Sequence, residues 1–387
     1  MANGKIAIIS TAMTEFGDLY EYEITDIANL AIFEALDKIK AEKKDIESLY
    51  VGNMGSHLFE GQENLGNLIA TYAGLTCPAF KIQAAGASGA VALRNAVKGI
   101  QSGSKEMVMV LGVEKMTEAT KQHEAQLALA SGLDTNWETR MGATLASLFA
   151  IMARAHMREY GTTREQIAQV VVKNHYNASL NPKAQYKNRV RLESVLNSKL
   201  LADPLRLFDA CALSDGAASV ILTSEELAYS YDSDPVFIHQ IKQGFAPIAL
   251  HMRESLTEFS GTKFAAEKAY KDQGITPKDI SFAEVHDIFS IAEIIAIESL
   301  GLVEKGKGGI ATENGDTSLE GSIPINTSGG LKGRGAPLGA SAIAQIIELY
   351  DQFKGNAGDR QISDLKYGLA HSMGGTGGTS VVTLIGR

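Results

Sequence analysis

The segment Ala84-Ala-Gly-Ala-Ser-Gly89 joins an apolar strand predicted at Phe80 to Ala84 to a helix of small residues predicted from Ala90 to Gln101. Open α/β sheets bind their ligands at such strand ends, where backbone N–H groups at the start of a helix polarise an anionic oxygen. Three other segments lie at or near predicted strand ends and are candidates for the same site: His286-Asp-Ile-Phe289, Asn326-Thr-Ser-Gly-Gly330 (which continues to Gly339) and Met373-Gly-Gly-Thr-Gly-Gly378.

Strand-like and helix-like patterns alternate on both sides of this turn. Apolar residues at helical spacing predict a helix from Ile24 to Lys40, and the uninterrupted apolar run Met107 to Gly112 predicts a buried strand. This alternation favours an α/β fold with a mostly parallel sheet and helices on both faces. It resumes after Pro235, with strands predicted at Val236 to Gln240, Ser281 to Val285, Ile323 to Asn326, Leu369 to His371 and Ser380 to Leu384.

Both halves place a glycine-flanked strand–turn–helix unit near their middle, which predicts two copies of one α/β unit. The predicted division is residues 1–230 and 235–387. Residues 114–203 break the alternation, hold the single Trp (Trp137) and a long helix from Thr144 to Tyr160, and are interpreted as a loop domain inserted in the first half.

Composition excludes several classes of protein. The 387 residues carry a net charge of −9, which disfavours nucleic acid as a partner. Apolar residues make up 45% and charged residues 21%, values typical of a well-packed protein and not of a disordered chain. The 38 glycines exceed the usual share of about 7% and indicate many tight turns.

The cellular context is predicted from cysteines and apolar runs. Only Cys77 and Cys211 occur, so a reducing compartment is expected, and both are interpreted as packing residues. The N-terminus lacks a signal-peptide pattern, and no run of about 18 apolar residues predicts a membrane span. The sequence therefore predicts a soluble, cytoplasmic protein with no metal site.

Taken together in their order along the chain, these motifs resemble the thiolase superfamily, and most of all its archaeal and sterol-carrier-type branch. The resemblance runs almost end to end. It is carried by Gln62-Glu-Asn-Leu-Gly66, Gly112-Val-Glu-Lys-Met-Thr117, Val172-Lys-Asn-His-Tyr-Asn177, Asn181-Pro182, Pro204-Leu-Arg-Leu-Phe-Asp209, Ser214-Asp-Gly-Ala-Ala218, His286-Asp287, Asn326-Thr-Ser-Gly-Gly330 and Gly374-Gly-Thr-Gly377.

The resemblance implies a thiolase fold: two similar mixed-sheet α/β halves with buried helices and an inserted loop domain. It also implies a dimer or higher oligomer, and an acyl-coenzyme A as ligand, with coenzyme A as part of the substrate and no tightly bound cofactor. Thiolases of this kind use a nucleophilic cysteine at the start of the first buried helix. A histidine in a Gly-His-Pro turn activates it, and an Asn or His of the second half holds the thioester oxygen.

The sequence departs from the thiolase pattern at the positions that carry this chemistry. Gly86 stands where the family has its nucleophilic cysteine, and Ala336 replaces the histidine of the Gly-His-Pro turn. Ile288 and Met373 stand where many relatives have further cysteines. Because these side chains neither attack a thioester nor carry a proton, an acyl-enzyme mechanism is excluded for this chain.

The remaining polar groups define the predicted site. His286 matches the oxyanion-holding position and is the first candidate for catalysis, against the alternative of a hydrogen-bonded histidine at a strand end. His371 and Tyr367 are further candidate bases, against core packing. Substrate contacts are predicted for the turn residues Gly86, Ser88, Asn326, Gly329, Gly330, Ala336 and Gly375. Lys187, Arg189 and Arg191 are either contacts to coenzyme A phosphates or a solvated charged face.

Three functions remain open. The first is a lyase that cleaves or forms a carbon–carbon bond beside a coenzyme A thioester, by retro-aldol or Claisen-type chemistry, without an acyl-enzyme. The second is a catalytically silent subunit that binds acyl-coenzyme A or scaffolds a complex with an active thiolase or a small zinc-ribbon and OB-fold protein. The third is an acetyl-coenzyme A acetyltransferase inactivated by design, although four altered positions favour natural divergence.

Overall fold

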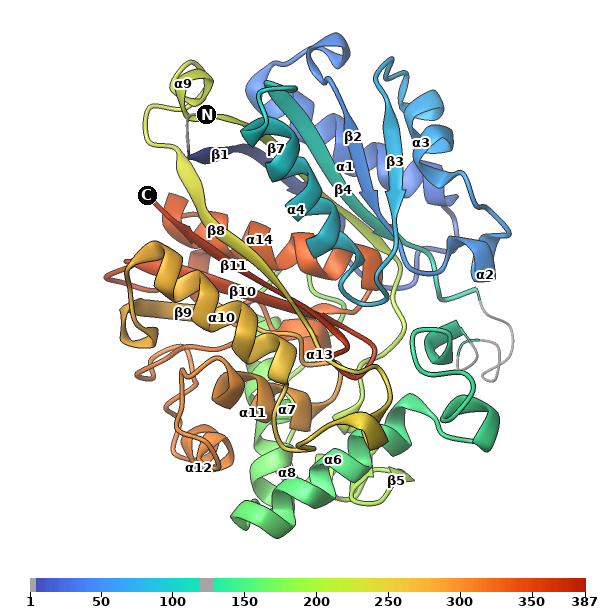
Figure 1. Ribbon diagram of the computed structural model, residues 1–387, viewed down its shortest axis with the longest axis vertical. Helices are drawn as coiled ribbons and strands as arrows, with labels where there is room; N and C mark the ends of the chain where they lie inside the picture. The colour runs from blue at the N-terminus through green and yellow to red at the C-terminus, as the bar shows by residue number, and fades with distance from the viewer. Residues whose placement is uncertain (1–4, 119–124, 126–127) are drawn as a thin grey trace.

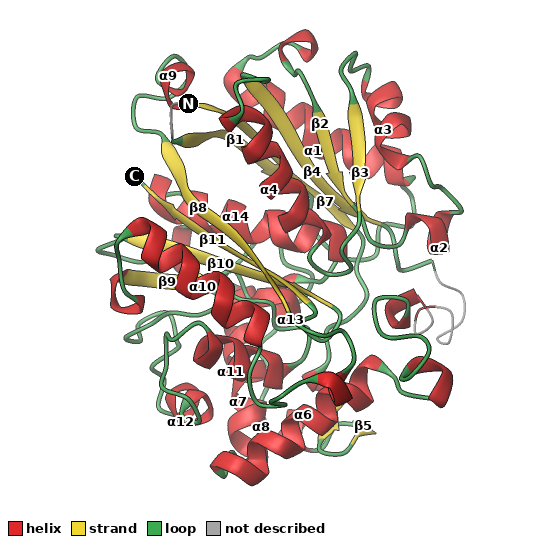
Figure 2. Ribbon diagram, in the orientation of Figure 1, coloured by secondary structure: helices red, strands yellow, loops and turns green. Residues whose placement is uncertain are grey.

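The computed structural model describes residues 5–118, 125 and 128–387, and nine of its strands form one mixed sheet. The strand order is β3-β2-β4-β7-β1-β8-β11-β10-β9, and Figure 2 shows the strands crossing the molecule between helices. The strands of this sheet are β1 (Ile6–Met13), β2 (Leu49–Gly52), β3 (Ala79–Ile82), β4 (Met107–Glu114), β7 (Gly216–Ser224), β8 (Val236–Phe245), β9 (Ile280–Glu284), β10 (Tyr367–Gly374) and β11 (Thr379–Gly386).

The two halves of the sheet have related pairing. In the first, β2 is parallel to β3 and β4, while β7 is antiparallel to β4 and β1. In the second, β9 is parallel to β10, while β11 is antiparallel to β10 and β8. β1 and β8 pair antiparallel and join the halves. Both faces of these strands are covered, which is why β4 is buried throughout and is apolar from Met107 to Val113.

Two helices, α4 and α14, lie in contact at the centre of the molecule. Their apolar faces, which include Leu93 of α4 and Ile343 of α14, share one core with strands from both halves of the sheet. The longer helices are α1 (Ile24–Ile39), α3 (Leu65–Ala73), α4 (Ser88–Gln101), α6 (Leu145–Tyr160), α7 (Arg164–Ser179), α10 (Ser260–Gln273), α11 (Ser290–Ser299) and α14 (Leu338–Lys354), and the shorter ones are α2 (Ser56–Glu60), α8 (Leu192–Leu196), α9 (Glu225–Ala228), α12 (Gly308–Glu313) and α13 (Gly330–Arg334).

The close approach of α4 and α14 depends on glycine. A Cβ atom on Gly89 would lie 2.6 Å from the carbonyl oxygen of Gly339, so any larger residue would push the two helices apart. Ile343 and Ala342 of α14 surround the same point at 3.3 and 3.4 Å. This packing fixes the position of the turn that precedes α4.

The chain leaves the sheet after β4 and returns at β7, which is paired with β4. The intervening residues form α6, α7, α8 and the hairpin of β5 (Leu200–Ala202) and β6 (Leu205–Arg206), drawn in green in the lower part of Figure 1. α7 packs against α11, α12 and α13 of the second half. The predicted loop domain, 114–203, includes residues 119–124 and 126–127, which lie outside the described residues. The division at 230–235 stays a prediction.

The strand predicted from Ile323 to Asn326 is wrong. Only an isolated bridge between Ile325 and Ala283 forms there, because Asn326 adopts a left-handed backbone (φ 57°) that ends the extended run. β8 is longer than predicted and reaches Phe245, which brings its end to the level of the glycine turns. Within the described ranges, no helix has the length and hydropathy needed to cross a membrane.

Candidate active site at the strand ends

The turn before α4 is held by Ser88, the first residue of that helix. The Ser88 hydroxyl donates to the carbonyl of Ala85 (2.6 Å) and accepts from the N–H of Ala84 (2.9 Å). These bonds stabilise the left-handed backbone of Ala85 (φ 50°). Ser88 is fully buried and therefore shapes the turn, and no base contacts its hydroxyl in the described structure.

The imidazole of His286 lies against Gly86. A Cβ built on Gly86 would be 2.8 Å from Cε1 and 3.0 Å from Nε2 of His286, and 2.7 Å from the carbonyl oxygen of Met373. Side chains essentially never approach a Cβ so closely. His286 therefore occupies the space into which any side chain at position 86 would project.

His286 is a neutral imidazole at physiological pH. His286 is only 2% exposed, and its Nδ1 atom has no hydrogen-bond partner among the described residues. Burial, and then the positive charge of Arg334, lower its pKa to about 3. The ring can donate or accept a hydrogen bond at this position, but it takes up a proton only when negative charge develops beside it.

His371 lies on β10 as a second buried imidazole. Its Nε2 is 2.9 Å from the hydroxyl of Thr262, in the first turn of α10, and its Nδ1 has no partner within the described structure. Burial, and then the charge of His286, lower its pKa to about 3. The two histidines thus interact electrostatically, and the Nδ1 atom of each ring has no partner among the described residues.

Asp287 follows His286 in sequence but does not orient its ring. The Asp287 carboxylate accepts from the N–H groups of Leu331 (2.6 Å) and Lys332 (3.2 Å) and from the side chain of Asn174 (2.7 Å). Burial, and then Glu293, raise its pKa to about 6. Asp287 therefore holds the start of α13 in place.

The predicted substrate contacts of Asn326, Gly329 and Gly330 are replaced by internal contacts. The Asn326 amide donates to Glu293 (2.7 Å), and its oxygen accepts from the N–H of Val285 (2.8 Å). A Cβ on Gly329 would meet Ala178 at 2.5 Å, and one on Gly330 would meet the Asp287 carboxylate at 2.3 Å. On the side where a Cβ would project, these glycines admit neighbouring parts of the protein.

Tyr367 lies apart from His286 and His371. It begins β10, whereas His371 lies four residues further towards the glycine turn. The Tyr367 ring packs edge-on against His239, and its hydroxyl is 3.4 Å from the side-chain nitrogen of Gln273. The geometry therefore does not support Tyr367 as an acid or base of this site.

Two more predicted contacts are placed by the backbone. The N–H of Ala336 donates to Ser214 (2.8 Å), and the Ala336 side chain is buried in the core. Gly375 has a left-handed backbone (φ 60°) and faces the carbonyl of Gly132, which a Cβ would approach to 2.5 Å. Gly375 thus brings the last glycine turn against the loop domain.

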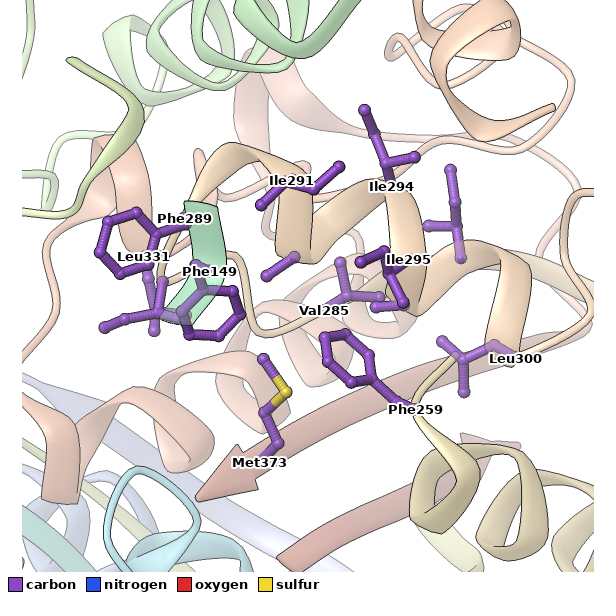
Figure 3. Close-up of a cluster of buried hydrophobic side chains, with 14 of the residues drawn as sticks. Phe149, Phe259, Val285, Phe289, Ile291, Ile294, Ile295, Leu300, Leu331 and Met373 are labelled. Carbon is purple, nitrogen blue, oxygen red and sulfur yellow. The ribbon is translucent and has the colours of Figure 1, made fainter. Parts of the chain in front are cut away.

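Apolar side chains fill the region behind His286. Met373 is completely buried, and Figure 3 shows it beside Phe259 and Phe149, near Val285 and Leu331. Ile288 joins the same core. Positions 288 and 373 therefore contribute packing here, and Phe259 and Thr262 are residues of this region that the sequence patterns did not single out.

A pocket of about 300 Å³ adjoins the turn before α4. It is lined by four groups of residues that are distant in sequence: Gln83, Ala84, Ala85; Ser131, Gly132; Phe245, Ala246, Ile248; and Gly374, Gly378, Thr379. Phe245 is 80% exposed at its rim. No local pattern could have joined these segments, because only the fold brings them together. The lining does not include His286, which lies deeper.

The two cysteines and the basic segment have structural surroundings. Burial raises the pKa of both thiols, and Cys211 donates to the carbonyl of Asp287 (3.2 Å). Lys187 pairs with Glu15 (3.2 Å), and Arg189 lies over the ring of Tyr176. Across the part of the chain that the structure describes, no group of three or more His, Cys, Asp or Glu side chains is arranged to hold a metal ion.

Known proteins with the same architecture cover the whole chain. Residues 6–226 match the thiolase N-terminal domain, and residues 244–387 match the thiolase C-terminal domain-like family. The chain is 46% identical to acetyl-CoA acetyltransferase of Methanothermobacter thermautotrophicus over 99% of both chains. It is 31% identical to human sterol carrier protein 2, covering 98% of this chain and 71% of that protein.

Solved structures agree. The Ltp2-ChsH2(DUF35) aldolase superposes with a TM-score of 0.85 at 24% identity, covering 98% of this chain and 97% of that chain. Acat5 thiolase from Ascaris suum in complex with coenzyme A superposes with a TM-score of 0.73 at 18% identity, covering 99% of this chain and all of that chain. Fold and sequence together show that the chain belongs to the thiolase superfamily.

Proposed function

We propose that this protein binds an acyl-coenzyme A thioester and cleaves or forms a carbon–carbon bond beside it, without a cysteine acyl-enzyme. The observation that carries the proposal is the position of His286, a neutral imidazole lying against Gly86 at the start of α4. A neutral imidazole N–H is a suitable hydrogen-bond donor to an oxygen on which negative charge develops.

A retro-aldol cleavage of a 3-hydroxyacyl thioester uses the groups that remain. A base takes the proton of the 3-hydroxyl, the bond between C2 and C3 breaks, and a carbonyl compound leaves. The electron pair of that bond forms the thioester enolate, whose oxygen is held by His286. The enolate then regains a proton at C2 to give the shortened acyl-coenzyme A. The reverse sequence forms the bond.

In this proposal His371 is the candidate base. Its Nδ1 is unbonded within the described structure, and Thr262 fixes its other nitrogen. The pKa of about 3 makes it a weak base before substrate binds. A negative charge forming next to the imidazoles raises their pKa, so proton uptake is coupled to formation of the enolate.

The relatives support an acyl-coenzyme A ligand. Two relatives, 46% and 42% identical to this chain, act by name on acetyl-coenzyme A, and a structural neighbour was solved with coenzyme A bound. The pocket of about 300 Å³ beside Ala84 and Ala85 is the proposed entry for the thioester end of this ligand. A dimer or higher oligomer remains an expectation from the family resemblance.

The second candidate is a catalytically silent subunit. The observation that favours it is the filled region behind Gly86, where Met373 and Phe259 pack and His286 lies deeper than the pocket. Such a subunit would bind acyl-coenzyme A or scaffold a complex with an active thiolase or a zinc-ribbon and OB-fold protein. One structural neighbour is an aldolase named together with a DUF35 protein.

One experiment separates the two candidates. The purified protein is incubated with 3-hydroxyacyl-coenzyme A thioesters, and release of an aldehyde or ketone and of the shortened thioester is followed by chromatography. Isothermal titration with the same thioesters measures binding. The proposed lyase predicts turnover that is lost in His286→Ala and reduced in His371→Ala. Tyr367→Phe is the matched control and should retain activity, because that hydroxyl lies at the other end of β10.

Binding without turnover in every variant would support the silent subunit. If neither binding nor turnover is found with thioesters of several chain lengths, acyl-coenzyme A is not the ligand of this chain. The lyase is then wrong, and only the scaffolding form of the second candidate remains.

A further inference from the structure

A second, smaller pocket lies between α4, β8 and α10, and its charge is opposite to that of the whole protein. Its volume is about 230 Å³. Figure 1 shows α4 and α10 on either side of β8. The lining residues define what we name the basic pocket: Arg94, Val97, Lys98 and Gln101 of α4; Ile238, His239, Gln240, Ile241, Lys242 and Gln243 of β8; and Lys268 of α10.

Four cationic side chains converge on the basic pocket. Lys242 forms an ion pair with Asp272 (2.7 Å), a residue outside the lining. Arg94, Lys98 and Lys268 form no ion pair with any described residue, and no Asp or Glu is among the described residues of the lining. In a chain of net charge −9, three cations at one pocket that form no ion pair with a described residue indicate a site for an anion.

We propose that the basic pocket binds a phosphate group, carried by inorganic phosphate or by the diphosphate end of a small metabolite. A guanidinium recognises phosphate oxygens through parallel N–H donors, and lysines add point charges. The side-chain amides of Gln101, Gln240 and Gln243 supply neutral donors around the same space. The volume is below the roughly 300–1,000 Å³ of pockets that enclose drug-sized ligands. It therefore fits one or two phosphate groups and not a whole nucleotide.

The basic pocket is separate from the candidate active site. α4 begins at the turn containing Gly86, and Lys98 lies ten residues after Ser88, which corresponds to about 15 Å of helix. The two places are connected by rigid elements: α4 leads to the Gly86 turn, and α10 carries both Lys268 and Thr262, the partner of His371. The proposal does not depend on the reaction catalysed at that turn.

The test uses the full chain and two anions, orthophosphate and pyrophosphate, titrated in a calorimeter at constant ionic strength set with sodium chloride. We expect saturable binding at one site per chain by at least one of the two anions. The double variant Arg94→Gln/Lys98→Gln is expected to bind at least about tenfold more weakly, because charge-assisted hydrogen bonds are lost. The preferred anion distinguishes a single phosphate from a diphosphate end.

The matched control is Lys44→Gln/Lys305→Gln, which makes the same change in net charge at two side chains that are 72% and 43% exposed and outside the lining. It should bind like the unaltered protein. Melting temperatures without anion establish that both double variants fold. Absence of saturable binding by the unaltered protein, or equal weakening in both double variants, would overturn the proposal.

Discussion

A Cβ atom on Gly86 would lie 2.8 Å from Cε1 of His286. Position 86, at which the family resemblance implies a nucleophile, is thus occupied on its Cβ side by a neighbouring imidazole as well as lacking a side chain. Only glycine fits at position 86 in this packing, so substitutions at positions 86 and 286 are expected to affect each other.

Gly86→Ala is expected to lower the free energy of unfolding by about 1–3 kcal/mol, the usual cost of forcing an extra methyl group into a packed interior. The methyl carbon meets both the His286 ring and the backbone carbonyl of Met373, and the carbonyl cannot turn away. Urea unfolding followed by circular dichroism measures the effect. Gly378→Ala is the control, because its Cβ would make contacts no closer than 3.4 Å.

Removing the imidazole should relieve part of this strain. Gly86→Ala/His286→Ala is expected to be more stable than the sum of its two single variants, with the difference reporting the contact between positions 86 and 286. If the changes in unfolding free energy of the two single variants add up to that of the double variant, the ring does not occupy the space beside Gly86.

Thiolysis of acetoacetyl-coenzyme A should be absent from the unaltered chain, because no nucleophilic thiol stands at position 86. Gly86→Cys/Ala336→His restores the two side chains but leaves the new sulfur against His286, so no activity is expected. Adding His286→Asn provides room, and this triple variant is expected to gain measurable turnover. Activity in the unaltered chain would contradict the mechanistic argument, and activity in the double variant would contradict the steric one.

Thr262→Val should lower the free energy of unfolding by about 1–3 kcal/mol, because it leaves a buried ring nitrogen of His371 without its partner. The Thr262 hydroxyl also donates to Ser380 (3.0 Å), so two buried groups lose a bond. Thr71→Val is the control, since that hydroxyl is exposed and bonds only within its own helix. Thermal unfolding of the two variants side by side gives the comparison, and equal melting temperatures would show that the Thr262 bond is not formed.

Acidification should destabilise the fold through the two histidines. Their pKa values fall from 6.5 to about 3 on folding, so the folded state binds fewer protons than the unfolded state between these pH values. Well above pH 6.5 each histidine is neutral in both states and does not lower the free energy of unfolding. Below pH 6.5 its destabilising effect grows as the pH falls towards 3. By pH 5 the loss is about 2 kcal/mol for each ring.

The measurement is the difference in unfolding free energy between pH 7.5 and pH 5 for the unaltered protein and for His371→Asn. Burial raises the pKa of Glu114 and Glu284 to about 7, and these carboxyl groups stabilise the fold as the pH falls. They are present in both proteins and cancel in the comparison. An identical pH dependence would mean that His371 titrates normally in the fold.

The thiolase fold was predicted from the family resemblance, which the order of the motifs along the whole chain carries. The periodicity of apolar residues predicted α1 within one residue of its observed ends. The absence of a nucleophile at Gly86 is also a property of the sequence alone. The strand predicted from Ile323 to Asn326 was wrong because the Asn326 side chain accepts a hydrogen bond from the N–H of Val285. No local periodicity encodes this contact.

Only the tertiary structure decided what the candidate site residues contact. Sequence made both Tyr367 and His371 candidate bases. In the fold they lie four residues apart on β10, and the charge of His286 acts on His371. Ser88 and Gly330 were predicted to contact substrate. In the fold, the Ser88 hydroxyl donates to the carbonyl of Ala85, and Gly330 packs against the Asp287 carboxylate. The basic pocket required α4, β8 and α10 to meet. The physical reason is that spacing along a chain specifies which face of an element a residue occupies, whereas its neighbours across space depend on how the elements pack.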